Sequence, residues 1–290
     1  GLIGPGTMAL SVICNADDFG ISEGASRGIV DCHLAGAVTS ATWMANMPAS
    51  AFAADLARAN PRLGVGLHFN LTSGAPLSEE SKRSGLVGVD GQFVSRKELA
   101  RRLMTGRVGT SELASELAAQ LAEMERLGLR PTHIDSHQHV HAFPPVFDVV
   151  SREAANLGLP VRLPVRWPGR RIRDSLRRSL SEAVLDLLVA RCVKRFGRRA
   201  VTNDGLCSVF DLGIPPKDIA AGAYRALLEP YQDGVVEIMV HPAIVDQELK
   251  QLTEITEVSA VEYRLLLTGC IQDCVAARGG RLCTYADAWA

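Results

Sequence analysis

The stretch Leu10-Ser-Val-Ile-Cys-Asn-Ala-Asp-Asp-Phe-Gly20 begins with a short apolar run and ends on two adjacent carboxylates. A short apolar run that stops at polar residues and glycine is typical of a strand buried on both faces. The pattern therefore predicts a buried strand that presents Asp17 and Asp18 at its C-terminal end.

The same pattern recurs along the chain. Further strands are expected at 38–45, 63–67, 132–141, 159–163, 207–210, 235–240 and 281–285, and helices at 22–30, 48–60, 111–127, 144–156, 174–194, 216–228 and 260–278. This alternation predicts a parallel α/β sheet, and 290 residues suit one distorted (β/α) TIM-like barrel of seven or eight strands. We expect a single domain over residues 8–290, with its active site at the C-terminal strand ends and an excursion or lid over 73–110.

The composition is that of an ordinary globular chain, 47% hydrophobic and 22% charged. A net charge of −1 gives no global attraction to nucleic acid, and no apolar run reaches the roughly 18 residues needed to span a bilayer. Residues 1–7 lack the features of a secretory signal, so we expect them to be a remnant added for expression and the protein to be cytoplasmic. The seven cysteines lack C-x-x-C spacing and are expected to be reduced, and the oligomeric state is left open.

Residues 132–141, Thr-His-Ile-Asp-Ser-His-Gln-His-Val-His, carry four imidazoles and one carboxylate in ten positions. Side chains alternate across a strand, so persistent extended geometry would align on one face His133, Asp135, His137, His139 and His141. Imidazole is the commonest nitrogen ligand for metals in proteins, and a nearby carboxylate can ligate the ion or fix a ring tautomer. The cluster therefore indicates metal chemistry.

Four predicted strands end on residues that can bind a metal or move a proton: Asp17 and Asp18, His68, His137, and His241. One aspartate with two histidines is a common facial ligand set for a divalent ion, so Asp18, His68 and His137 are assigned as the metal ligands. Each residue also has a plainer interpretation, because paired acids can cap a turn and isolated histidines usually belong to the core or the surface.

Bound metal would acidify a water ligand and polarise a carbonyl, which favours amide hydrolysis. Asp17 is then the candidate general base and His241 the candidate general acid. Arg162 is expected to hold Asp17 ionised, or else to form an ordinary ion pair, and Asp135 to orient an imidazole. The remaining histidines of the cluster are expected to have structural or supporting roles.

Two other classes of function compete with a hydrolase. Two histidines and one aspartate also suit a non-haem Fe(II) oxygenase, although such an enzyme does not require the acid and base. A non-catalytic sugar-binding or regulatory protein on the same fold is the second alternative.

Four blocks of sequence carry a specific resemblance: 15–20 (NADDFG), 66–72 (GLHFNLT), 131–141 (PTHIDSHQHVH) and 237–243 (EIMVHPA). In this order they resemble the signature blocks of the YdjC/ChbG carbohydrate deacetylases. The resemblance implies a barrel related to the NodB-type polysaccharide deacetylases, a divalent metal usually described as Mg²⁺, and removal of acetyl from an N-acetylated sugar such as a chitooligosaccharide. It also places the metal histidines on His68 and His137, the aspartate pair on Asp17 and Asp18, and the late histidine on His241.

Several features lie outside this resemblance. Residues 166–199 carry eleven Lys or Arg against three acids, which predicts a solvated basic helix face or, alternatively, a patch for an anionic or lipid-linked sugar. Aromatic residues make up 5% of the chain, and those near predicted strand ends that could stack on a sugar are Trp43, Phe69, Phe143 and Trp167. A mixed nitrogen and oxygen site accepts Mg²⁺, Zn²⁺, Mn²⁺ or Co²⁺.

Overall fold

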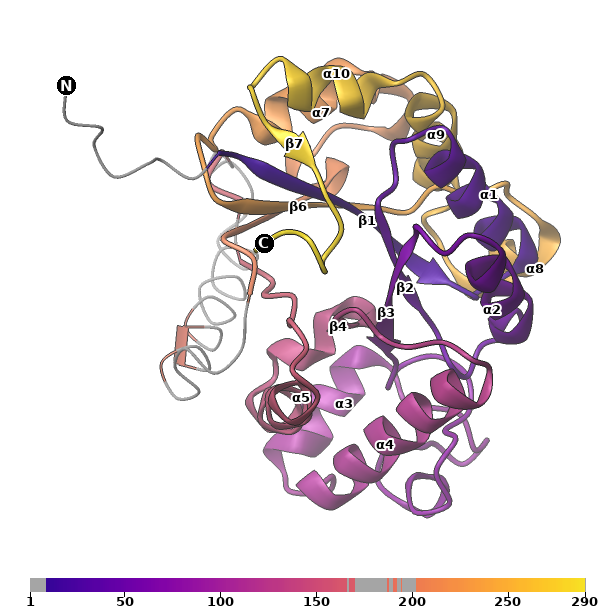
Figure 1. Cartoon of the computed structure of the whole chain (residues 1–290). Coiled ribbons are helices and arrows are strands. Elements are labelled where there is room, and N and C mark those ends of the chain that lie inside the picture. Colours follow the sequence, from indigo (N-terminus) through magenta and orange to yellow (C-terminus); the bar gives the residue numbers. More distant parts are fainter. Residues whose placement is uncertain are drawn as a thin grey trace.

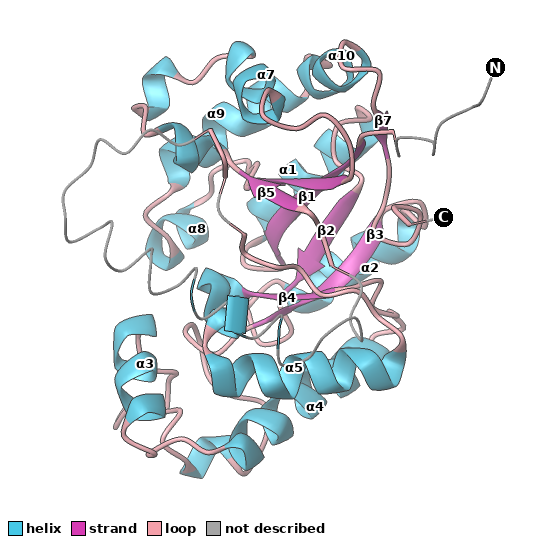
Figure 2. Cartoon of the chain, turned by 90° about the vertical axis from the view of Figure 1, so that its left-hand side faces the viewer, coloured by secondary structure: helices cyan, strands magenta, loops and turns pink. Residues whose placement is uncertain are grey.

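A computed structural model of the protein describes residues 9–165, 167–169 and 202–289, with residues 187, 190, 191 and 194 between them. A seven-stranded sheet lies at its centre (Figure 2). Its strands are β1 (Ser11–Phe19), β2 (Ser40–Trp43), β3 (Gly64–Phe69), β4 (Ile134–Ser136), β5 (Gly205–Cys207), β6 (Val235–Val240) and β7 (Arg281–Leu282). The order is β4-β3-β2-β1-β6-β5, β7 pairs with the start of β1, and every pairing is parallel. The predicted parallel α/β fold is confirmed.

Helices surround the sheet, with α3, α4 and α5 grouped near β4 and α7, α9 and α10 near its opposite end (Figure 1). The α-helices are α1 (Glu23–Leu34), α2 (Ser50–Ala59), α3 (Arg96–Met104), α4 (Thr110–Arg126), α5 (Pro144–Leu157), α7 (Gly222–Leu228), α8 (Gln247–Leu252), α9 (Thr256–Leu266) and α10 (Cys270–Ala276). Short 3₁₀ turns are η1 (Ser81–Arg83), η2 (His137–Ala142), η4 (Val209–Leu212) and η5 (Pro216–Asp218). Most of the predicted helix 174–194, and most of the basic segment 166–199, lie outside the described residues.

The central strands are buried on both faces. All residues of β1, β3 and β6 are buried, including the polar Asp17, His68 and Glu237. Helices cover one face of the curled sheet, and buried side chains fill the other, where Arg162 reaches Asp17 of β1 and Glu237 of β6. No helix among the described residues is long and apolar enough to cross a membrane. The six described cysteines are free, and all but Cys274 are buried.

Asn203 links the two edges of the curled sheet. Its side-chain oxygen accepts from the Leu163 amide at 2.7 Å, and its nitrogen donates to the carbonyls of Leu163 and Gly205, both at 3.0 Å. The predicted strand 159–163 is reduced to one parallel bridge, between Val161 and Ile134 of β4. A side-chain amide therefore spans the gap between this segment and β5 that a backbone ladder would otherwise close.

The predicted strand 132–141 is wrong in its second half. Strand β4 ends at Ser136, and the chain turns into η2, where Gln138 and His139 have φ values of 54° and 53°. The turn is held by the Ser136 hydroxyl, which accepts the His141 backbone N–H at 2.9 Å. The expected row of histidines therefore does not continue to His139 and His141.

Two other predicted elements are divided. The strand expected at 207–210 ends at Cys207, and η4 follows it. The helix expected at 260–278 is two helices, α9 and α10, because Gly269 has a left-handed φ of 83° that interrupts the helical ladder. The expected excursion 73–110 contains α3, and it is anchored to α4 by Glu116, which accepts the Leu77 and Ser78 amides at 3.0 Å each.

Candidate metal and catalytic site

A bulge at the end of β1 aims both aspartates at the site. Ala16 pairs with Ala41 and Phe19 with Trp43, so Asp17 and Asp18 together face the single residue between these partners. Asp18 has a φ of 64°, a left-handed conformation that is uncommon for a residue other than glycine. A bulge re-aims side chains that an ordinary strand would send to opposite faces.

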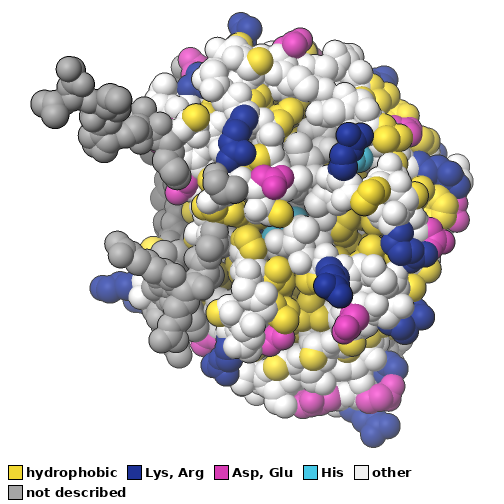
Figure 3. Space-filling view, in the orientation of Figure 1, with side chains coloured by type: hydrophobic (Ala, Val, Ile, Leu, Met, Phe, Trp, Pro, Cys, Tyr) yellow, Lys and Arg dark blue, Asp and Glu magenta, His cyan; other side chains and the backbone are white. Residues whose placement is uncertain are grey.

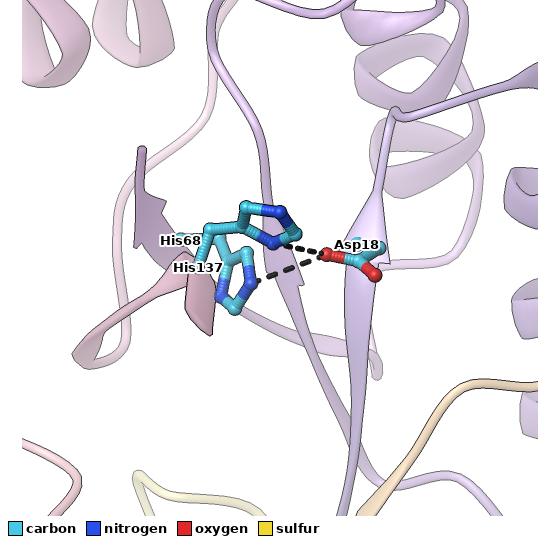
Figure 4. Close-up of side chains that lie close together, drawn as sticks. All are labelled: Asp18, His68 and His137. Atoms are coloured by element: carbon cyan, nitrogen blue, oxygen red, sulfur yellow. Dashed lines mark hydrogen bonds and ion pairs between the residues drawn. The ribbon is translucent and has the colours of Figure 1, made fainter. Parts of the chain in front are cut away.

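Asp18, His68 and His137 converge, as Figure 4 shows. One carboxylate oxygen, Asp18 Oδ1, lies 3.3 Å from His68 Nε2 and 3.0 Å from His137 Nδ1. The three residues come from the C-terminal ends of β1 and β3 and from the residue directly after β4. The structure thus brings together all three residues that the sequence assigned as ligands.

Asp135 fixes the orientation of the His68 ring. Its Oδ1 lies 2.6 Å from His68 Nδ1, and the two residues are register partners in β3 and β4. Burial lowers the pKa of His68, but the carboxylates of Asp135, Asp17 and Asp18 together outweigh this and raise that pKa to about 10. Burial raises the pKa of Asp18, but the neighbouring His137 and His68 hold it well below its usual value.

These donors fit a divalent cation. A ligating histidine typically donates its second ring nitrogen to a carboxylate, which is the arrangement of His68 and Asp135. The side chains of Asp18 and His137 are 11% and 14% exposed, so the cluster can be reached from outside. A second group, Asp17 with His68 and Asp135, is equally compact. It fits less well, because Arg162 already pairs with both of its carboxylates.

Arg162 is fully buried and holds Asp17 from two sides. Its Nη1 donates to Asp17 Oδ2 at 2.7 Å and its Nη2 to Asp17 Oδ1 at 2.5 Å. The Asn15 amide also donates to Asp17 Oδ1, at 2.9 Å. Burial raises the pKa of Asp17, but the charge and hydrogen bonds of Arg162, with the His68 charge, together outweigh this, so the pKa is lowered and the carboxylate stays ionised. The predicted pairing of Arg162 with Asp17 is therefore present.

Sequence reasoning missed the other partners of Arg162. The guanidinium also forms ion pairs with Asp135, at 2.8 Å, and with Glu237 of β6. Glu237 accepts in turn from the Tyr285 hydroxyl, and burial raises its pKa to about 7. The sequence did contain a signal for this contact: Glu237 lies inside the otherwise apolar run 235–240. A carboxylate buried in a central strand requires a charged or hydrogen-bonding partner.

His241 follows β6 on the other side of β1. Val240 pairs with Ala16, so His241 and Asp17 directly follow the last residues paired between β6 and β1. The His241 backbone N–H donates to buried Glu262 at 2.7 Å, while its ring atom Nδ1 is buried without a hydrogen-bond partner. Burial lowers the pKa of His241, although the charges of Asp17 and Asp18 act in the opposite direction.

The remaining histidines of the cluster lie outside the Asp18 group. His133 stacks on Tyr285 with ring centroids 3.7 Å apart, and burial lowers its pKa to about 3. The His141 ring lies 2.5 Å from the Ser136 hydroxyl and 2.7 Å from the Arg162 carbonyl, so it supports the segment that carries Arg162. His139 packs edge-on against His141, and its buried Nδ1 has no hydrogen-bond partner among the described residues.

Comparisons with known proteins identify the family of the chain. The family model described as YdjC-like protein matches residues 11–277. The chain belongs to the YdjC family. It is 37% identical to a carbohydrate deacetylase of Geobacillus stearothermophilus, over 95% of this chain and 96% of that protein. It is 32% identical to a chitooligosaccharide deacetylase of Proteus mirabilis, over 97% and 99% of the two chains.

A solved structure of similar length supports the fold. A protein of Enterococcus faecalis described as a cellobiose-phosphate cleavage protein superposes with a TM-score of 0.77 at 26% identity, over 96% of this chain and 98% of that one. The resemblance found in the four sequence blocks is thus confirmed for this YdjC chain.

Over the face in Figure 3, basic and acidic side chains are interspersed and form no broad patch of one sign.

Proposed function

We propose that this YdjC protein is a metal-dependent hydrolase that removes the acetyl group from an N-acetylated amino sugar or oligosaccharide. The observation that carries the proposal is the convergence of Asp18, His68 and His137 beside the Asp17–Arg162 pair and His241. The names of the curated relatives, carbohydrate and chitooligosaccharide deacetylases, support the reaction and the class of substrate.

Asp18, His68 and His137 would hold the divalent ion. The chemistry supplied by such an ion is acidification of a water ligand and polarisation of a carbonyl, both of which assist amide hydrolysis. The mixed donor set suits Mg²⁺, which the family resemblance favours, and also Zn²⁺, Mn²⁺ or Co²⁺. Asp135 keeps the Nε2 atom of His68 directed at Asp18 by holding the opposite ring nitrogen.

Asp17 acts as the general base. It is ionised because Arg162 and Asn15 donate to its oxygens, and those contacts also fix its direction. A base held in place by hydrogen bonds loses little orientational freedom when it takes a proton from the attacking water.

His241 acts as the general acid. Burial favours its neutral form, so the imidazole must gain a proton within the site before it can protonate the leaving amine. The proton that Asp17 takes from the attacking water is available for this step, because Asp17 and His241 directly follow the last residues paired between β1 and β6, Ala16 and Val240. The cycle thus moves one proton from water to the amine, and acetate and the free amino sugar are released.

The test is an acetate-release screen over N-acetylglucosamine and its oligomers, with and without a chelator. We expect acetate release with Mg²⁺ or Zn²⁺ under anaerobic conditions. An Fe(II) oxygenase would be inactive there, because it needs both iron and O₂. Asp17→Asn should abolish release and retain bound metal, whereas Asp90→Asn, at an exposed turn, should behave as the parent protein. Failure of every sugar to release acetate in the presence of metal would overturn the proposal, and a sugar-binding role would replace it.

A further inference from the structure

Phe210 is the single exposed aromatic side chain among the described Phe, Trp and Tyr residues, with 40% of its surface accessible. Its ring lies against that of His241, with centroids 5.5 Å apart and planes inclined by 69°. Isolated exposed apolar residues are common on proteins and require no explanation. Phe210 differs because it lies beside the proposed proton donor.

A short, well-braced turn fixes the position of Phe210. Val209 is 2% exposed and anchors η4 in the core. The Asp211 carboxylate accepts the Ser208 amide at 2.8 Å, and the Asp211 amide donates back to the Ser208 carbonyl at 3.0 Å. Gly213, with a φ of 63°, ends the turn. The ring is thus held at the site before any ligand binds, which reduces the entropy lost on binding.

Three of the four aromatic candidates from the sequence are not available for this role. Trp43 and Phe69 are fully buried and Trp167 is 8% exposed, because their rings pack into the core. Phe143 is half-buried, and the Arg96 guanidinium lies 5.7 Å from its ring centroid. Phe210 was missed because the sequence pattern predicted a strand there.

The reaction itself brings a sugar ring to Phe210. A general acid must lie within about 2.6–3.2 Å of the atom that it protonates, so the amide nitrogen of the substrate must approach the His241 ring. In an N-acetylated amino sugar this nitrogen is bonded directly to a ring carbon, and the pyranose therefore lies next to His241 as well. Phe210 occupies that neighbourhood, and its negative π face attracts the weakly positive C–H groups of a pyranose.

We propose that Phe210 is the platform on which the pyranose carrying the N-acetyl group stacks, so that it selects cyclic amino sugars over acyclic N-acetyl amines. This inference rests on the proposed deacetylase function, since it is the proton transfer to the amine that locates the sugar. Phe210 positions the ring and takes no part in proton transfer.

The test compares Phe210→Leu, which keeps an apolar side chain without the aromatic face, with Phe210→Trp, which restores one. For N,N′-diacetylchitobiose we expect Phe210→Leu to raise KM about tenfold with little change in kcat, equivalent to ~1.4 kcal/mol. Phe210→Trp should recover most of the loss. An acyclic substrate, N-acetylethanolamine, should show no dependence on residue 210. Leu267→Ala, which removes a 42% exposed apolar side chain after α9, is the matched control.

Calorimetric titration of the same disaccharide into each protein separates this proposal from the function on which it rests. Binding weakened about tenfold by Phe210→Leu supports the platform, even if no acetate is released and the deacetylase proposal fails. Unchanged binding in Phe210→Leu overturns the platform, even if acetate release is normal. Absence of measurable binding to the parent protein also overturns it.

Discussion

The guanidinium of Arg162 donates to both carboxylate oxygens of Asp17, at 2.7 and 2.5 Å, from a position 145 residues further along the chain. Both side chains are buried, and the same guanidinium also pairs with Asp135 and Glu237. One cation therefore links the proposed base to the carboxylate that orients His68. This geometry makes the direction of Asp17 depend on a planar group with several donors.

Arg162→Lys should lower kcat on the order of a hundredfold, because lysine keeps the charge but cannot donate to two oxygens in a fixed plane. Acetate release measures the effect, and circular dichroism shows whether the fold is retained. Arg126→Lys is the matched control, since Arg126 makes an equivalent two-pronged pair with Glu123 on the exposed surface of α4. Near-normal turnover in Arg162→Lys would contradict the role assigned to the pair.

His137→Ala should weaken metal binding by more than about a hundredfold and abolish acetate release, because one of three proposed ligands is removed. Elemental analysis after dialysis reports the metal content. His139→Ala, two residues further along, should keep its metal, because His139 lies outside the Asp18 group. Stoichiometric metal in His137→Ala would show that the ligand set is wrong.

The metal-free protein should lose stability as pH rises above 6.5. His68 has a folded pKa of about 10 against 6.5 unfolded, so its contribution is complete below pH 6.5 and is lost as pH approaches 10. Buried Glu237 and Glu262, with pKa values of about 7 and 8, act in the same direction above pH 4.5. Asp18 acts in the opposite direction, because its pKa is lowered. Its contribution to stability is present above pH 3.8 and is lost as pH falls below that value.

Burial lowers the pKa values of His133, His139 and His141 to about 3, 3 and 4, so these histidines make stability rise with pH up to 6.5. Thermal melts in chelator should therefore give the highest Tm near pH 6.5 and a declining Tm above it. Added divalent metal should raise Tm most at alkaline pH, because it binds the deprotonated histidines. A metal-free Tm that rises from pH 6.5 to 9 would contradict the raised pKa of His68.

Gly66→Ala should destabilise the fold by about 1–3 kcal/mol, through overpacking against His133. A Cβ atom at Gly66 would lie 2.5 Å from the His133 ring, which cannot move away because Tyr285 stacks on it. Gly222→Ala is the control: a Cβ there meets nothing within 4 Å, so it should be neutral or stabilise by about 0.4–1 kcal/mol. Urea unfolding measures both, and equal stabilities for the two variants would refute the clash.

Much of the site follows from sequence pattern, for a local reason. An apolar run reports a buried strand, and the polar residue that ends it lies at the edge where parallel strands build a site. That reasoning located Asp17, Asp18, His68, His137 and His241 on neighbouring strand ends. The four sequence blocks then identified the family, which the family model confirms.

The tertiary structure decided how those residues face one another. The bulge at Asp18 and the left-handed turn at Gln138 and His139 depend on backbone angles that side-chain periodicity does not encode. The partners of Arg162 and the exposure of Phe210 depend on packing between segments that are distant in sequence. The sequence by itself thus determined which chemistry is present and at which edge of the sheet, because strand burial is a local property. The directions in which these side chains point, and the residues with which they pair, were decided only by contacts between segments distant in sequence.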